Sequence, residues 1–185
     1  MRLFVAIELD EGARLAIAEE QKRVKRALGD NTLKWVRPEH MHLTLAFLGE
    51  VNDARSQALA EVMRQPIDRP RLAIAFGGLG MFPPHGAPRV LWLGVNAGDA
   101  EVIDIQRVVA ERLKGLGVEI EARPFHPHLT LARWRDSRPS DRRRLTGVEK
   151  RESIARIAAT SVTLLHSRLS SNGPTYTALS QAPLT

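Results

Sequence analysis

The stretch His42-Leu43-Thr44-Leu45-Ala46 returns later in the chain as His128-Leu129-Thr130-Leu131-Ala132. In both copies another histidine stands two positions before the stretch, and a proline stands four positions before it. Outside these segments the two halves of the chain share little obvious identity. The duplicated feature is therefore a site.

Each copy alternates leucine with polar or small residues at the period of a β-strand. Successive side chains of a strand point to opposite faces, so we expect the leucines to face a core and the histidine and threonine to share the other face. At a rise of about 3.3 Å per residue, His42 and Thr44 should lie roughly 6.6 Å apart along the strand. That spacing suits contact with different atoms of one small group, and His128 and Thr130 repeat it.

The length and composition set further bounds. A chain of 185 residues is long enough for one domain with a complete core, and we expect a single domain over residues 1–185. No apolar run approaches the roughly 18 residues of a membrane-spanning helix, so a cytoplasmic protein without a membrane partner is expected. The absence of cysteine excludes disulfides, thiolate catalysis and cysteine-ligated metals. The net charge of +6 favours an anionic partner such as a phosphate-bearing ligand.

Periodicity and turn signals predict an alternation of strands and short helices. A helix is expected from Glu11 to about Leu28, capped by Asp10, ended by Gly29 and carrying Leu15 on its apolar stripe. The stretch 77–88 is so rich in glycine and proline that it is predicted to be a loop. Further helices are expected at about 53–63 and 100–114. Strands are expected at 3–7, 34–37, 42–48, 71–77, 90–95 and 128–133. The chain is expected to end in a hairpin whose strands 161–169 and 175–180 are joined by a turn at 170–174. This order favours an α+β domain with mainly antiparallel sheet.

The residue types on the duplicated face suit acid–base chemistry on a phosphodiester. Histidine has a pKa of about 6.5, so one of two histidines can act as a base while the other acts as an acid. The two threonine hydroxyls can donate hydrogen bonds to non-bridging oxygens, and Arg133 can neutralise charge if the second strand bends near its end. These parts fit phosphodiester cleavage without a metal, although they do not by themselves select one phosphodiester.

Both copies form a His-x-Thr-x signature, and the chain resembles the two-histidine (2H) phosphoesterase superfamily, specifically the RNA 2′,3′-cyclic phosphodiesterases, also called 2′-5′ RNA ligases. The resemblance extends from the opening Arg2-Leu3-Phe4-Val5-Ala6, through both signatures, to a Gly-x-x-Tyr at Gly173 to Tyr176. It implies a bilobal α+β fold of two pseudo-symmetric lobes, each of mainly antiparallel sheet flanked by helices, with an active-site cleft between them.

The resemblance also implies an activity and roles for individual residues. The implied reaction is hydrolysis of a 2′,3′-cyclic phosphate to a 2′-phosphate without a metal or other cofactor, and a reversible 2′-5′ RNA ligase activity is compatible with it. His42 would be the general acid and His128 the general base, while Thr44, Thr130 and Arg133 would contact the phosphate. The implied partners are RNA with a 2′,3′-cyclic phosphate end, including tRNA fragments, or cyclic nucleotides, and the protein is expected to be a monomer.

Two other classes of function stay open at this point. With His40 and His126 the chain offers four imidazoles at strand spacing, which zinc could accept, although few carboxylates stand nearby and the threonines would then have no task. A basic RNA-binding module with little turnover would share the same phosphate contacts. A polar strand face is usually just surface, but packing gives no reason to duplicate it.

Two other groups of residues bear on nucleic-acid binding. Phe47 and Phe82 could stack bases, whereas Trp92 stands among apolar strand residues and is expected in the core. The stretch from Arg133 to Arg144 holds six arginines against two aspartates. Beyond Arg133 it is expected to be a solvated loop, with contact to an RNA backbone as the alternative.

Overall fold

The computed structural model of the chain describes residues 1–29, 32–120, 123–170 and 173–185. The strands are β1 (Arg2–Glu8), β2 (Leu33–Trp35), β3 (His42–Glu50), β4 (Leu72–Phe82), β5 (Val90–Ala97), β6 (His128–Trp134), β7 (Ala155–Ala159), β8 (Ser161–Ser170) and β9 (Gly173–Pro183). The helices are α1 (Glu11–Leu28), α2 (Asp53–Val62), α3 (Asp99–Gly115) and α4 (Asp141–Thr146), with a 3-10 turn at Pro38–His40.

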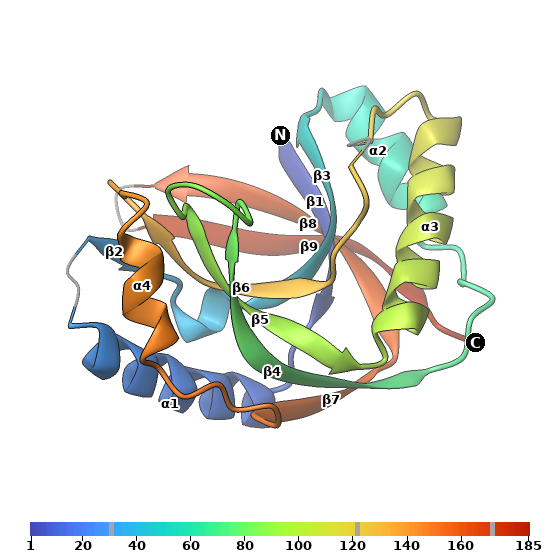
Figure 1. The fold of residues 1–185 in the computed structure, drawn as a ribbon. Coiled ribbons are helices and arrows are strands. Elements are labelled where there is room, and N and C mark those ends of the chain that lie inside the picture. The colour runs from blue at the N-terminus through green and yellow to red at the C-terminus, as the bar shows by residue number, and fades with distance from the viewer. Residues whose placement is uncertain (30–31, 121–122, 171–172) are drawn as a thin grey trace.

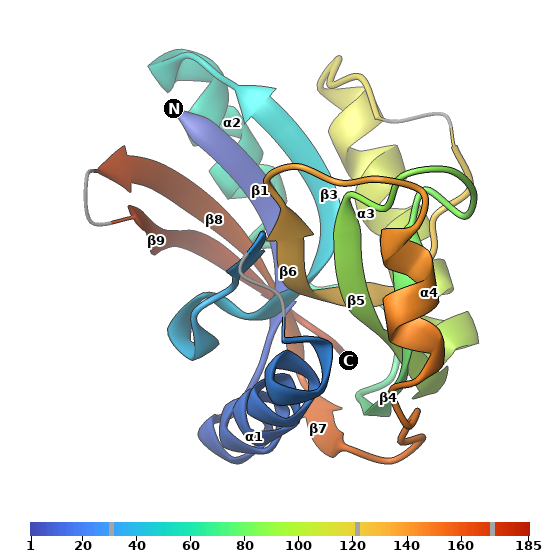
Figure 2. The same cartoon turned by 60° about the vertical axis from the view of Figure 1, so that its left-hand side comes forward.

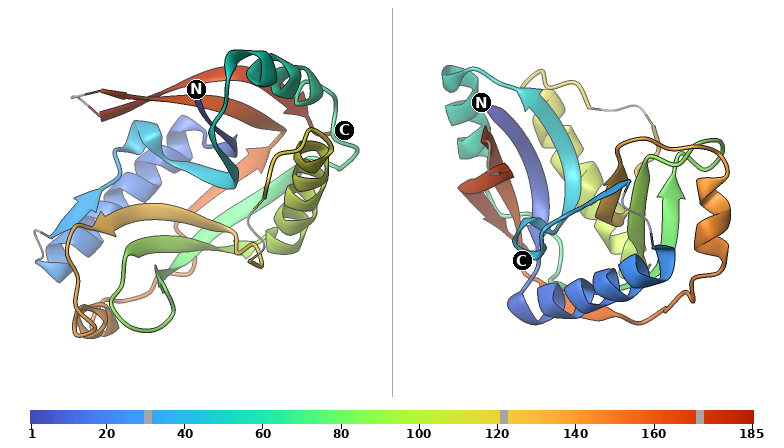
Figure 3. Two further views of the ribbon diagram at one scale, coloured as in Figure 1. Left: turned by 90° about the horizontal axis from the view of Figure 1, so that it is seen from above. Right: turned by 90° about the vertical axis from the view of Figure 1, so that its left-hand side faces the viewer.

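The strands form two antiparallel sheets, which confirms the α+β class (Figure 1). The first sheet has the order β3-β1-β8-β9 and the second the order β2-β6-β5-β4-β7. Helix α1 runs along one end of both sheets, and α4 lies at the outer side of the second (Figure 2). Strands β3 and β6, which carry the duplicated stretch, contact each other where the two sheets meet (Figure 3).

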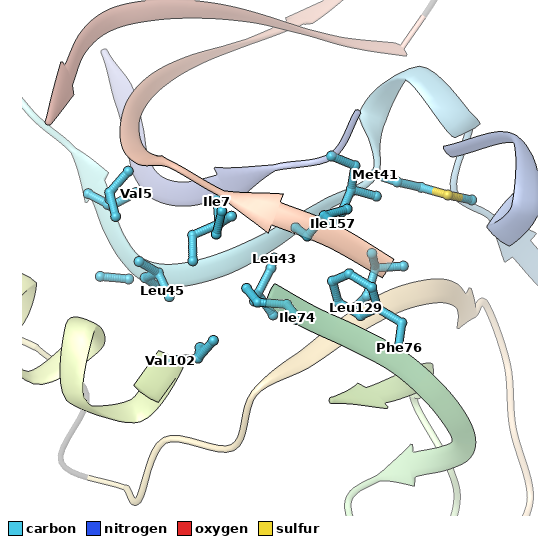
Figure 4. Packing of buried hydrophobic residues seen from close by; sticks show 14 of the residues in the cluster. Val5, Ile7, Met41, Leu43, Leu45, Ile74, Phe76, Val102, Leu129 and Ile157 are labelled. Atoms are coloured by element: carbon cyan, nitrogen blue, oxygen red, sulfur yellow. The ribbon is translucent and has the colours of Figure 1, made fainter. Parts of the chain in front are cut away.

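One cluster of buried hydrophobic side chains extends through both sheets. Leu43 and Leu45 of β3 lie in it together with Leu129 of β6, as Figure 4 shows. Burying a leucine side chain contributes about 1.5–3 kcal/mol, so these positions fix which face of each strand turns inward. The histidines and threonines of both copies are partly exposed on the opposite face, as the alternation predicts.

Helix α1 begins and ends where the sequence indicates. The Asp10 carboxylate accepts a hydrogen bond from Ala13 N at 2.8 Å, and Gly29 ends the helix in the left-handed conformation at φ 57°. The prediction that Leu15 belongs to the apolar stripe is wrong, since 62% of this residue is exposed. The buried face is instead centred on Ile17 and includes Ala13, Ala18, Gln21 and Val24.

The prediction of a loop over 77–88 is wrong for its first half, because β4 continues to Phe82 and pairs with β5. Two glycines of β4 allow other segments to approach it closely. A Cβ at Gly80 would overlap the Trp92 indole, and one at Gly77 would overlap the backbone of Glu152. Glycine here allows a close approach between segments and does not interrupt the strand.

Two elements of the structure were not predicted from the sequence. Strand β7 forms the edge of the second sheet, and α4 lies within the basic stretch that was expected to be a loop. The C-terminal hairpin is confirmed as β8 and β9, while residues 171 and 172 of its predicted turn lie outside the described residues. In the part of the chain that the structure describes, no helix is long and apolar enough to cross a membrane.

Candidate active site

Both strands of the duplicated stretch carry a β-bulge at the same position. In β3, the register with β1 shifts so that Thr44 and Ala46 have partners and the intervening Leu45 does not. In β6, Thr130 and Ala132 pair with successive residues of β5, which leaves Leu131 as the extra residue. A bulge places two residues opposite one and reverses the alternation of faces beyond it.

The bulges bring one further residue of each strand to the face of the histidines. In both copies the leucine and the alanine are buried in succession, and the next residue, Phe47 or Arg133, is exposed. Arg133 stands at odd spacing from His128 and would otherwise point to the core side. The bulge in β6 therefore provides the bend near the end of the strand that Arg133 needs to reach the site.

Gln21 of α1 supports the bulge in β6. Its Nε2 donates hydrogen bonds to the carbonyl oxygens of Leu131 at 3.0 Å and Val36 at 2.8 Å. Val36 N also donates to the Leu131 oxygen, at 2.8 Å. The carbonyl oxygen of Leu131 thus accepts hydrogen bonds from α1 and from the residue that follows β2, as a buried polar group requires. Gln21 is not among the site residues predicted from the sequence, and its one signal there is a glutamine on the buried face of an amphipathic helix.

His42 is packed between aromatic rings on the first sheet. Its ring centroid lies 4.7 Å from that of Phe4 and 5.3 Å from that of Tyr176, which it meets edge to face at 83°. Burial lowers the pKa of His42 to about 4; a hydrogen bond with the backbone of His40 opposes this, whereas the charges of His40 and Arg14 add to it. At neutral pH the imidazole of the unliganded protein is therefore neutral.

His128 has a matching environment on the second sheet. Phe82 meets it edge to face at 4.9 Å and 83°, and Trp92 lies at 6.2 Å. Its Nδ1 lies 2.8 Å from the His126 carbonyl oxygen. Because a carbonyl only accepts, Nδ1 carries the proton and Nε2 is left to meet a ligand. Burial is the main cause that lowers the pKa of His128. The hydrogen bond with the His126 backbone opposes this decrease, whereas the charges of His126 and Arg133 lower the pKa further.

Trp92 lies at the site and not in the core, where it was expected. It is partly exposed on the face of its strand that also bears Thr130 of the neighbouring strand, and its ring contacts Phe82 at 5.1 Å and His126 at 5.1 Å. The glycine at position 80 beneath the indole provides the space for this position. The two histidines of the second copy thus rest against an aromatic pair.

The charge of Arg133 acts on groups in both halves of the site. The Tyr176 ring contacts both His40 and His42 on the first sheet. Burial raises the pKa of Tyr176, and the charge of Arg133 on the second sheet opposes that rise. Because Arg133 also acts on His128, its guanidinium is close enough to influence groups of both halves. Tyr176 was noted in the sequence only as part of the family signature, and its place beside His42 comes from the structure.

A cavity of about 410 Å³ opens beside His42. Phe47 and Leu169 of its lining each have 67% of their surface exposed, so two large apolar side chains of the cavity face solvent. The cavity is lined by Arg2, Leu3, Phe4, His42, Phe47, Gly49, Ser167, Leu169, Pro174 and Tyr176. An aromatic hollow next to an acid–base group has the shape and chemistry of a nucleoside site.

The zinc alternative finds no support in the geometry. Among the residues that the structure describes, no group of three or more histidine, aspartate or glutamate side chains is placed so that it could hold a metal ion. His40 instead packs against Tyr176, and His126 against Trp92 and Phe82. Both therefore line the site as ring partners.

Comparison with known proteins gives a consistent result. The family described as LigT like Phosphoesterase matches the chain twice, over residues 7–92 and 93–176. An RNA 2′,3′-cyclic phosphodiesterase of Archaeoglobus fulgidus is 35% identical over 184 residues, covering 95% of this chain and 96% of the relative. One of Thermus thermophilus is also 35% identical and covers 100% and 90%, respectively.

Solved structures show the same fold. E. coli LigT in complex with 3′-AMP superposes with a TM-score of 0.81 at 28% identity, over 100% of this chain and 98% of that one. LigT in its apo form gives a TM-score of 0.78 at 28% identity, over 100% and 97%. Each of the two successive family matches contains one bulged histidine strand, β3 in the first match and β6 in the second. The chain therefore belongs to the LigT-like phosphoesterase family, and the resemblance to the two-histidine phosphoesterases is confirmed.

Proposed function

We propose that this protein is an RNA 2′,3′-cyclic phosphodiesterase that opens the cyclic phosphate to a 2′-phosphate by metal-independent catalysis with His42 and His128. The observation that carries the proposal is the duplicated bulged strand, which gives each lobe one histidine and one threonine on a common face and, in β6, brings Arg133 to that face as well. The names of the relatives support the same substrate.

In this mechanism the two histidines act on opposite sides of phosphorus. His128, as base, takes a proton from the attacking water while the water oxygen bonds to phosphorus. The bond from phosphorus to the 3′ oxygen breaks, and His42, as acid, gives its proton to that oxygen. With an RNA 5′-hydroxyl in place of water, the same step would form a bond from the 5′ oxygen to phosphorus, break the bond to the 3′ oxygen and give a 2′-5′ linkage, which is the proposed ligase activity.

The low pKa of His42 is compatible with an acid role only in the complex. In the unliganded protein burial keeps the imidazole neutral. A phosphate anion bound beside it favours the charged form and raises the pKa. The substrate itself would thus create the protonated histidine that the reaction requires.

The remaining groups bind the substrate. Thr44, Thr130 and Arg133 would donate hydrogen bonds to the non-bridging oxygens, where negative charge grows during attack. Phe47 would stack on the base of the terminal nucleotide in the adjoining cavity. One copy of the chain supplies all these groups, so we propose a monomer acting as a single bilobal domain on RNA ends such as those of tRNA fragments.

The proposal predicts turnover of 2′,3′-cyclic AMP in the presence of excess EDTA, with 2′-AMP as the product. Phosphorus NMR identifies the product directly, because 2′- and 3′-phosphates differ in chemical shift. A reaction that stops in EDTA and resumes with added zinc would instead support the four-histidine metal site. No turnover under either condition, with binding of RNA retained, would indicate a binding module.

The site also predicts an acidic pH optimum for kcat/KM. The reaction needs one protonated and one neutral histidine, and this form is most populated between the two pKa values. The pKa of His42 is about 4 and that of His128 lies below 6.5, so the bell-shaped profile should peak between about 4 and 6.5. The profile of kcat should peak at higher pH, because bound phosphate raises both pKa values.

Protein stability must be followed in the same pH series. The unfolded chain takes up protons on these histidines below about pH 6.5, whereas the folded protein resists protonation, so stability falls as the pH drops toward 4. Circular dichroism therefore defines the range in which the activity profile is valid. A kcat/KM optimum above pH 7.5 in fully folded protein would contradict the prediction.

A further inference from the structure

Two more cations lie on the strand face that carries His128 and Thr130. Lys34 of β2 pairs directly with Arg133 of β6. Directly opposed residues of an antiparallel pair project from the same face, so Lys34 stands beside Arg133. The ladder continues with a hydrogen bond from Arg135 N to Thr32 O at 3.0 Å, which places Arg135 next along this face.

The row formed by Lys34, Arg133 and Arg135 lacks counter-charges. All three residues are exposed, and none of the ion pairs among the described residues includes them. Some arginines elsewhere on the surface have acidic partners: Arg64 lies 2.7 Å from Glu61 and Arg107 lies 3.2 Å from Asp104. Like charges directly opposed across two strands destabilise a sheet. A local arrangement that costs stability without a compensating contact is typical of a functional surface.

One neighbouring arginine of the same basic stretch has a structural role. Arg142 Nε donates to the Gly86 carbonyl oxygen at 2.7 Å, and its guanidinium also donates to Pro83 O. It thereby fastens α4 to the turn after β4. The Asp141 carboxylate accepts from the backbone N of Arg138 at 2.7 Å. Arg142 is thus engaged within the protein, whereas Lys34 and Arg135 are exposed beside Arg133.

We propose that Lys34 and Arg135 continue from Arg133 as a track for the backbone phosphates of an RNA strand whose terminal phosphate lies at the two histidines. This inference rests on the proposed function and specifies its substrate class. The row starts at the reacting phosphate and leads to an open edge of the second sheet, so its natural ligand is a polyanion with regularly spaced charges. The preferred substrate is accordingly an oligonucleotide and not a cyclic mononucleotide.

The test compares two substrates, 2′,3′-cyclic AMP and an oligoribonucleotide of about ten residues with a 2′,3′-cyclic phosphate end. The changes Lys34→Glu and Arg135→Glu should each lower kcat/KM for the oligonucleotide by about tenfold, mainly through KM, and reduce its dependence on salt concentration by about one phosphate contact. The value for 2′,3′-cyclic AMP should stay within about twofold, because a mononucleotide does not reach the track.

Lys114→Glu is the matched control. Lys114 is exposed on α3, at the opposite side of the molecule from β2 in Figure 1, and its replacement changes the net charge by the same amount. If this control lowers oligonucleotide turnover as much as Lys34→Glu does, only the overall charge matters and the track is refuted. An equal loss for both substrates in Lys34→Glu would also overturn it, by placing Lys34 in the catalytic machinery.

The track and the proposed function can fail separately. If the wild-type protein hydrolysed neither substrate, the proposed function would be wrong. Fluorescence anisotropy of the labelled oligonucleotide with the same variants would still test the track. Weaker binding in Lys34→Glu and Arg135→Glu, but not in Lys114→Glu, is the result expected, and equal binding in all variants would refute it.

Discussion

Replacing His128 with alanine should lower kcat/KM for 2′,3′-cyclic AMP by about 10²- to 10⁴-fold, and replacing His42 should have an effect of similar size. Each change removes one of the two proton transfers and leaves phosphate binding by the threonines and Arg133 in place. The variant with both changes should lose little more than either single variant, because the two groups act as a unit. Steady-state kinetics at the pH optimum of the wild type measures these ratios.

The fold must be preserved for this result to be informative. His128 packs against Phe82 and His42 against Phe4, so alanine also removes ring contacts. Glutamine at each position retains more of the side-chain volume without titrating, and thermal unfolding of both pairs of variants separates packing from catalysis. His85→Ala is the matched control, since this histidine is exposed between β4 and β5 and should keep full activity. Single variants within a few-fold of wild type would refute the two-histidine mechanism.

Replacing Arg133 with alanine is expected to lower kcat/KM for the cyclic mononucleotide by about 10²- to 10³-fold, the usual consequence of removing one donor to a developing negative charge. The effect should fall mainly on kcat, because the charge on the non-bridging oxygens grows in the transition state. Arg133→Lys keeps the charge but loses the planar pair of donors, and should recover only part of the activity. Kinetics with the mononucleotide isolates this contribution from the rest of the basic row.

Arg143→Ala provides the comparison for this change. Arg143 is an exposed arginine of α4, and its replacement should leave mononucleotide turnover unchanged. Equal losses of kcat/KM in both variants would mean that Arg133 acts only through the overall positive charge of the surface. Full activity of Arg133→Ala would contradict its role as a phosphate ligand.

The parts of the fold that could be predicted are those specified by neighbours in sequence. The cap at Asp10 and the glycine after Leu28 define α1 because both act within one helical turn. The alternation in His42 to Leu45 correctly assigns the faces of β3, since one face must be buried. The residues of the duplicated stretch therefore identified the strand faces and the candidate site together.

The features that could not be predicted depend on partners far away in the chain. Gly80 lies within β4 because Trp92 of another strand fills the place of its side chain. β7, rich in alanine, has little strand propensity of its own and forms by pairing with β4 at the edge of the sheet. The contribution of Gln21 to the bulge, and of Tyr176 to the environment of His42, required the folded chain.

The two bulges also give the site a direction. Each presents the fifth residue after its histidine, and these residues differ: an aromatic ring in one lobe and a cation in the other, Phe47 and Arg133. A nucleotide has the same polarity, with a flat apolar base at one end and charged phosphate at the other. In the proposed mechanism the acid–base pair can therefore remain nearly symmetric, while the orientation of the RNA strand is decided at two positions that transfer no protons.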